Sequence, residues 1–171
     1  MKHKSIILII VIAVAAAAIF LSPGKKSYRT IMAVGSPAPA FELMDSTGRL
    51  WKLSDLKGKV VFINFWATWC TTCKAEAPQK TALFNAMQGK PFQMLGVLYR
   101  DGAENLPGYS MKIPVSAPTL IDPGNSMAKL YGITGVPESF ILDKEGILRE
   151  RLIGPQEWSG PEKMALIEKW L

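Results

Sequence analysis

A chain of 171 residues with a net charge of +6 is long enough for one globular domain and a short extension. The charge is unevenly divided, because five of the 20 basic residues and none of the 14 acidic residues lie before residue 32. The rest of the chain is nearly neutral, whereas binding to nucleic acid requires a clustered basic surface. The near-neutral charge after residue 31 therefore argues against nucleic acid as a partner, and the basic excess belongs to the N-terminal end.

The N-terminal segment predicts attachment to a membrane. Residues 5–21 form an uncharged apolar run that is just about long enough to span a bilayer as a helix. We expect residues 1–4 to be a cytoplasmic tail and residues 5–21 to be a transmembrane signal anchor, with a cleaved signal peptide as the alternative. Basic residues flank both ends of the run, so the positive-inside count alone is close to a tie.

A polar segment rich in turn residues, 22–36, is typical of a linker between this anchor and a domain over residues 37–171. If the short tail stays in the cytoplasm, the domain lies outside, where cysteine pairs meet an oxidising environment. We therefore expect the domain on the extracytoplasmic, periplasmic side of the inner (cytoplasmic) membrane of a bacterium.

Within the domain, strand and helix patterns alternate. The first half begins with a predicted hairpin over 41–53, with its turn at 45–48, and a helical turn over 54–58. Strands over 60–66 and 90–99 follow, with a helix over 74–88 between them. The second half contains a strand over 119–121, a helix over 125–131, strands over 138–142 and 147–153, and a helix over 161–171. Residues 100–117 are the least regular, with a short helix around 104–111 that Pro107 and Gly108 interrupt. The strand–helix–strand order predicts a right-handed parallel crossover in an α/β domain.

The only two cysteines, Cys70 and Cys73, stand between the predicted buried strand 60–66 and the helix that follows. Unpaired N–H groups and the positive dipole end at the start of a helix favour a reactive thiolate. A zinc site needs more ligands, and the single histidine, His3, lies beyond the apolar run. Haem attachment needs a histidine where this chain has Lys74. Two buried structural thiols remain an alternative.

A second motif, Gly135-Val-Pro137, stands immediately before the predicted strand 138–142. A proline at this place is ordinarily a turn or a strand edge. If the Val136–Pro137 bond is cis, however, the backbone can present hydrogen-bonding groups beside the cysteines, and a cis-proline is normally a deliberate feature. The motif therefore favours a reactive cysteine pair over a structural one.

With these motifs in place, residues 37–171 resemble the thioredoxin superfamily, and more narrowly its TlpA/ResA/CcmG (DsbE) group. The residues that carry the resemblance are the hairpin, Asn64-Phe-Trp-Ala-Thr-Trp-Cys70, Cys73-Lys-Ala-Glu-Ala-Pro78 and the stretch 131–143. The resemblance implies a thioredoxin-like α/β fold: a central mixed sheet flanked by helices, with an N-terminal β-hairpin extension and an N-terminal transmembrane helix. It also implies a membrane-tethered, extracytoplasmic thiol–disulfide oxidoreductase, several of which act as reductants in cytochrome c maturation.

The same resemblance implies roles for the redox residues. Cys70 matches the exposed attacking cysteine and Cys73 the resolving one. Glu76 matches an acidic residue that tunes the cysteines and relays protons, although a solvated helix glutamate is the alternative. Asn64 occupies the place where ordinary thioredoxins carry a buried aspartate, so that any acid–base role falls to Glu76 or to another acid.

For substrate binding, the resemblance points to Trp69, Val136, Pro137 and Glu138. Pro137 matches the cis-proline. Glu138 matches a residue that lines the substrate groove, with an exposed strand-edge charge as the alternative. Thr71-Thr72 replaces the proline-containing dipeptides common in the group, which leaves the strength of this chain as a reductant open.

The expected function is reversible exchange with protein disulfides, without a cofactor or a metal. Apocytochrome c is the candidate substrate, and a membrane protein of the CcdA/DsbD type is the electron donor that the resemblance implies. Two other functions stay open. One is a Cu(I)-binding metallochaperone-type module, since thiolates suit this ion. The other is a peroxiredoxin-like peroxidase, which the residues in front of Cys73 disfavour.

Overall fold

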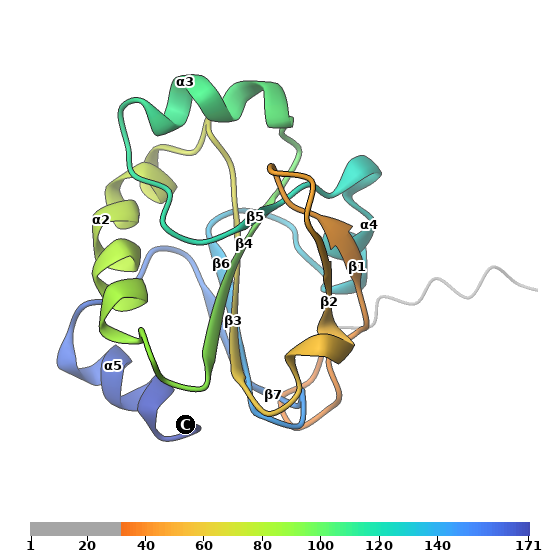
Figure 1. Cartoon of the computed structure of the whole chain (residues 1–171), viewed down its shortest axis with the longest axis vertical. Helices are drawn as coiled ribbons and strands as arrows, with labels where there is room; N and C mark the ends of the chain where they lie inside the picture. The colour runs from red at the N-terminus through yellow and green to blue at the C-terminus, as the bar shows by residue number, and fades with distance from the viewer. Residues whose placement is uncertain (1–31) are drawn as a thin grey trace, which may run out of the picture.

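The computed structural model describes residues 32–171, and a five-stranded sheet runs through their centre (Figure 1). The predicted tail at 1–4, the predicted transmembrane helix at 5–21 and residues 22–31 of the predicted linker lie outside the described residues. Among residues 32–171, no helix is both long and apolar enough to cross a bilayer.

The sheet has the strand order β5-β4-β3-β6-β7. The central strand β3 pairs in parallel with β4 and antiparallel with β6, so the sheet is mixed, as expected. Every residue of β3 is buried, because layers cover both faces of the sheet. The bounds are β3 Val60–Trp66, β4 Phe92–Leu98, β5 Thr119–Leu120, β6 Glu138–Leu142 and β7 Leu148–Ile153.

The two faces of the sheet carry different layers (Figure 1). Helices α2 (Thr71–Ala86) and α5 (Pro161–Glu168) cover one face. The hairpin of β1 (Glu42–Met44) and β2 (Leu50–Lys52) covers the other face together with α4 (Ser126–Leu130). Helix α3 (Leu106–Ser110) lies at the end of the sheet where β3 runs into α2. Three short 3-10 turns span Leu53–Leu56, Ala103–Asn105 and Pro123–Asn125.

Helix α5 ends at Glu168 rather than at residue 171, and two other differences between predicted and observed helices have local causes. Helix α2 begins at Thr71 rather than at residue 74, because the sulfur of Cys70 caps its first turn. The short helix expected in 104–111 exists as α3, but Pro107 does not interrupt it. The proline lies in the first turn, where a helix has no use for the missing N–H.

The N-terminal part of the described chain is packed onto the domain. Met32 is buried in the core on the hairpin side of the sheet. The N–H of Gly35 donates to the carbonyl of Leu148 (2.7 Å), and the N–H of Leu148 donates to the carbonyl of Ser36 (2.9 Å). Packed structure therefore begins before the predicted domain boundary at residue 37.

The hairpin reaches the opposite edge of the sheet. The N–H of Ser46 donates to the carbonyl of Thr119 (2.9 Å), and the N–H of Ile121 donates to the carbonyl of Met44 (2.9 Å). The chain between residues 35 and 46 thus crosses the face opposite α2 and touches both edge strands, β7 and β5.

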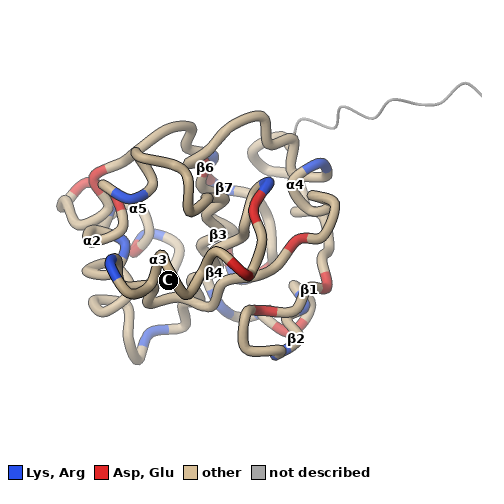
Figure 2. The backbone as a smooth tube through the Cα atoms, turned by 90° about the horizontal axis from the view of Figure 1, so that it is seen from above, with Lys and Arg blue, Asp and Glu red and all other residues tan. Residues whose placement is uncertain are grey.

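Charged residues are interspersed over the described part of the chain. Figure 2 shows lysines and arginines alternating with acidic residues around the fold, without a basic stripe. This distribution agrees with the near-neutral composition of the chain after residue 31.

Candidate active site

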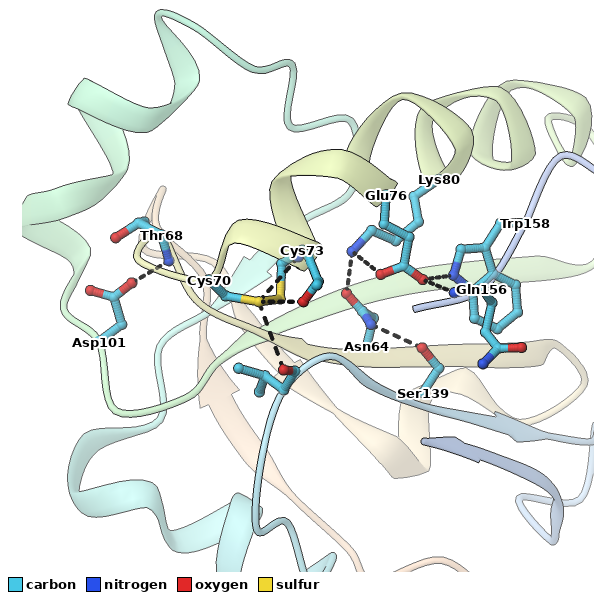
Figure 3. The surroundings of a disulfide bond; sticks show 12 residues. Asn64, Thr68, Cys70, Cys73, Glu76, Lys80, Asp101, Ser139, Gln156 and Trp158 are labelled. Atoms are coloured by element: carbon cyan, nitrogen blue, oxygen red, sulfur yellow. Dashed lines mark hydrogen bonds and ion pairs between the residues drawn. A yellow bond between two sulfur atoms is a disulfide. The ribbon is translucent and has the colours of Figure 1, made fainter. Parts of the chain in front are cut away.

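The two cysteines lie where β3 runs into α2, and they form a disulfide (Figure 3). Cys70 is the N-cap residue of α2, and its sulfur accepts the N–H of Cys73 at 3.1 Å. Cys73 is fully buried, whereas Cys70 keeps 5% of its surface exposed. The start of a 16-residue helix therefore points its N–H groups and dipole at the sulfur that a partner can reach. Such a position favours a thiolate when the pair is reduced.

The turn before Cys70 is fixed by neighbours from the segment after β4. The N–H of Thr68 donates to Oδ2 of Asp101 at 2.6 Å. Burial acts to raise the pKa of Asp101, but this bond and others from Thr68, Asn105 and Gly102 hold it below its ordinary value. Trp69 is 56% exposed, and its Nε1 donates to the carbonyl of Arg100 at 3.3 Å. An exposed indole is thus held next to the cysteines.

The Val136–Pro137 segment meets the disulfide from the other side. The peptide bond between the two residues is cis, as the motif suggested. The carbonyl oxygen of Val136 lies 3.7 Å from the sulfur of Cys70, and the hydroxyl of Thr72 lies 3.4 Å from the same sulfur. The structure therefore brings Val136 and Pro137 together with the cysteines.

Glu138 is placed differently from the other predicted site residues. It is 2% exposed, and its carboxylate accepts a hydrogen bond from Nε of Arg151 at 2.5 Å. Burial raises the pKa of Glu138, and Arg151 opposes this rise. In the sheet Glu138 is opposite Phe65, on the face away from α2. The alternative of an exposed strand-edge charge is wrong, because the carboxylate is buried against Arg151, and the groove contact stays a prediction.

Glu76 is buried beneath α2, with 3% of its surface exposed. Its Oε1 accepts hydrogen bonds from the indole of Trp158 and from the N–H of Gln156, the latter at 3.1 Å. Burial raises the pKa of Glu76, and the charge of Lys80 together with these donors opposes the rise. The alternative of a solvated helix glutamate is therefore wrong.

A chain of polar side chains continues from Glu76 into the sheet (Figure 3). Nζ of Lys80 lies 3.7 Å from Oε2 of Glu76 and donates to Oδ1 of Asn64 at 2.6 Å. Asn64 in turn donates from Nδ2 to the hydroxyl of Ser139 at 2.9 Å. These contacts join α2 to β3 and β6 directly behind the redox pair.

Sequence reasoning missed several members of this group, among them Lys80 and Trp158. The spacing of four residues between Glu76 and Lys80 was a usable signal, because such residues are neighbours on a helix. Trp158 lies in the loop between β7 and α5, and no local pattern indicates that it reaches Glu76.

These features define a class of protein: a thioredoxin-like α/β domain with a redox cysteine pair at the start of a helix. Residues 34–151 match the model of the AhpC/TSA family. The thiol-disulfide oxidoreductase ResA of Geobacillus thermodenitrificans is 34% identical over 126 residues, which are 74% of this chain and 72% of that protein. ResA of Bacillus cereus is 31% identical over 150 residues, which are 88% of this chain and 87% of that protein.

A solved structure has the same fold. The thioredoxin domain of a thiol-disulfide oxidoreductase from Bacteroides vulgatus superposes with a TM-score of 0.69 at 27% identity, covering 80% of this chain and 96% of that one. The chain therefore belongs to the AhpC/TSA family and, within it, to the ResA-type thiol–disulfide oxidoreductases. The expected thioredoxin-like fold, family and class of enzyme are confirmed.

Proposed function

We propose that this oxidoreductase reduces protein disulfides on the outer side of a bacterial cytoplasmic membrane, with residues 5–21 as its anchor and residues 1–4 in the cytoplasm. The observation that carries the chemistry is the Cys70–Cys73 disulfide at the start of α2, in which Cys70 keeps a small exposed surface of 5% and Cys73 is fully buried. Apocytochrome c is the proposed substrate. A membrane protein of the CcdA/DsbD type is the proposed source of electrons.

The proposed reaction has two steps. The thiolate of Cys70 attacks one sulfur of a substrate disulfide, forms a mixed disulfide and releases the first substrate thiolate. Cys73 then gives up its proton, and its sulfur attacks that of Cys70. The bond between Cys70 and the substrate breaks, and the second substrate thiolate leaves. Two electrons pass from the cysteine pair to the substrate, whose thiolates take up two protons.

Glu76 is the proposed acceptor of the Cys73 proton. The two residues are three positions apart on α2, so they lie on the same face of the helix, and both are buried. Burial raises the pKa of Glu76 above its ordinary value, which makes its carboxylate a stronger base than a solvated one. Cys73 has no exposed surface from which water could take its proton directly.

Trp69, Val136 and Pro137 are the proposed substrate contacts. The exposed indole of Trp69 offers apolar surface beside Cys70, and the backbone of Val136 offers a carbonyl next to the sulfur. For Glu138 we propose an indirect part: its pair with Arg151 fixes the start of β6 directly after Pro137.

A trapping experiment tests this function. Cys73→Ser expressed in the native host leaves the mixed disulfide at Cys70 unresolved, so we expect apocytochrome c or its maturation factors to be captured through a bond that reductant cleaves. The Cys70→Ser, Cys73→Ser double variant is the control and should capture nothing.

Other results would contradict the proposal. Full disulfide reduction by Cys70→Ser would exclude the two-step exchange. Peroxide-dependent turnover would favour the peroxidase, and stoichiometric retention of Cu(I) without disulfide reduction would favour the metallochaperone.

A further inference from the structure

The face of α2 that lies against the sheet carries three chemically active side chains in a row, Cys73, Glu76 and Lys80 (Figure 3). Their spacing of three and then four residues puts them on one stripe of the helix. Cys73 is fully buried, and the side chains of Glu76 and Lys80 are 1% and 14% exposed. A lysine that is this well covered differs from the solvated lysines of a surface helix.

The position of the Lys80 ammonium is fixed from two directions. It donates to Oδ1 of Asn64 at 2.6 Å, and Asn64 is itself held by its bond to Ser139. On the other side it lies 3.7 Å from Oε2 of Glu76. This buried oxygen has no hydrogen-bond partner among the described residues, so the ammonium is the polar group that faces it.

The surroundings of Glu76 offer it no other cation in the described part of the chain. The segment after β7 supplies neutral donors, the sheet supplies neutral amide and hydroxyl groups, and the Glu138–Arg151 pair lies on the opposite face. Gln156 and Trp158 from the loop donate to Glu76, and Lys80 of α2 lies beside it. Asn64 of β3 and Ser139 of β6 continue the network from Lys80, and Cys73 lies three positions before Glu76 on α2. An ionised carboxyl group that is buried needs such a counter-charge, because desolvation otherwise favours its neutral form.

A small pocket connects Lys80 with the surface. It measures about 50 Å³ and lies between α2 and residues 114–117, with Asn64, Lys80 and Thr119 in its lining. The hydroxyl of Thr119 is buried and has no partner among residues 32–171. The volume exceeds what one water molecule needs, and the polar groups of Asn64, Lys80 and Thr119 stand in a lining that is otherwise mostly apolar. Tyr109 also lines it, and burial raises the pKa of this phenol, so the pocket's tyrosine stays neutral.

We propose that Lys80 is a positioning residue for the second step of the exchange: its ammonium, anchored on Asn64, keeps the Glu76 carboxyl group charged and able to take the proton of Cys73. The proposal rests on the proposed function above. The proton moves from the sulfur of Cys73 to Glu76 and from there to water. The electron pair left on Cys73 forms the bond to Cys70, and the substrate sulfur leaves with the pair of the broken bond.

The test separates the two steps with dithiobis(nitrobenzoate), whose two coloured thiolates are released one per step. The reduced full chain in detergent is mixed rapidly with this reagent over a range of pH. For Lys80→Met we expect the first release to stay within about twofold of the wild type. An opposite charge within a few ångströms lowers a carboxyl pKa by about 1–3 units. The pH midpoint of the second release should therefore rise by about one to three units, and its rate near neutral pH should fall about tenfold or more.

Three variants distinguish positioning from a general disturbance. Lys80→Arg keeps the charge and should restore the pH midpoint. Lys90→Met removes a lysine from the exposed pair with Glu168 and should behave as the wild type. Lys80→Met added to Glu76→Gln should slow the second release no further than Glu76→Gln alone, because Lys80 acts through that carboxyl group.

Infrared difference spectra give a readout that does not depend on turnover. Lys80→Met should show the carbonyl band of a protonated carboxyl group at neutral pH, and Glu76→Gln should abolish it. A wild-type pH profile for the second release in Lys80→Met would overturn the proposal. Lys80→Gln, which keeps a donor for Asn64, replaces Lys80→Met if the latter does not fold. A wild-type chain that releases only one thiolate would instead contradict the proposed exchange itself.

Discussion

The pKa values of two buried carboxyl groups, Asp45 and Glu76, are shifted in opposite directions. Asp45, in the hairpin turn, accepts bonds from the backbone and hydroxyl of Thr47, the N–H of Arg49 and the indole of Trp51. Burial acts to raise its pKa, but these donors together lower it to about 2. Glu76 has fewer donors, and burial raises its pKa. The Asp45 carboxyl group is therefore charged at neutral pH, whereas burial disfavours the charged form of Glu76.

Asp45→Asn tests whether the charge of Asp45 stabilises the fold. The folded pKa of about 2 lies below the ordinary value of 3.8, so the charge stabilises the fold above pH 3.8, and the contribution is lost as the pH falls toward 2. We expect the variant to lose about 1–2 kcal/mol of unfolding free energy at pH 7 and much less near pH 2.

Urea unfolding at the two pH values measures this difference, and Asp55→Asn on the exposed helical turn is the control. An equal loss at both pH values would show that the Asp45 charge has no part in stability.

At the scale of elements, Gly96 of β4 makes room for the indole ring of Trp66, which belongs to the same buried cluster as the two cysteines. A Cβ atom at this position would lie 2.7 Å from Nε1 of Trp66. Trp66 cannot easily give way, because it packs against Tyr109 with ring centroids 4.9 Å apart, in the cluster that contains both cysteines. Glycine is therefore required here by packing rather than by backbone conformation.

Gly96→Ala should lower the unfolding free energy by about 1–3 kcal/mol, the usual cost of forcing extra atoms into a packed core. Gly108→Ala is the matched control, because a Cβ atom added there would meet no atom within 4 Å and alanine suits a helix better than glycine. Chemical denaturation of both variants checks this, and an unchanged midpoint for Gly96→Ala would contradict it.

The elements that the sequence predicts well are those with an unambiguous local pattern. The prediction for strand β3, Val60–Trp66, is confirmed without error, because its seven residues form an unbroken apolar, β-branched and aromatic run apart from Asn64. The start of α2 differs because the cap is a cysteine sulfur, which propensity rules do not anticipate. The contact between Glu76 and Trp158 spans 82 positions, so only the folded chain reveals it.

At the scale of the whole molecule, the stretch before residue 39 contributes to the domain although the sequence suggested a linker up to residue 36. It buries Met32 and pairs Gly35 and Ser36 with Leu148. Composition alone could not show this, since alanine, glycine, serine and proline suit both a linker and an extended segment on a sheet edge.

A pair of truncated chains tests this contribution. A chain that begins at Met32 retains these contacts, whereas one that begins at Pro39 loses them. We expect the shorter chain to be less stable by about 2–4 kcal/mol, from the burial of one methionine and two to three hydrogen bonds. Thermal and urea unfolding of the two proteins measure the difference, and equal stabilities would mean that residues 32–38 are a linker after all.

The stretch before residue 39 also affects how unfolded substrate proteins can bind to the sheet. An uncovered edge strand is a template on which any extended peptide can add itself, and this invites persistent association. Here residues 35–36 occupy the start of β7, and residues 44–46 occupy β5. An extended substrate protein is therefore kept from joining the sheet at these places, and the proposed contacts with it are those at Trp69 and Val136. In the proposed exchange, contact is then limited to a few residues around the sulfur of Cys70. The substrate protein can leave as soon as Cys73 has displaced it from the mixed disulfide.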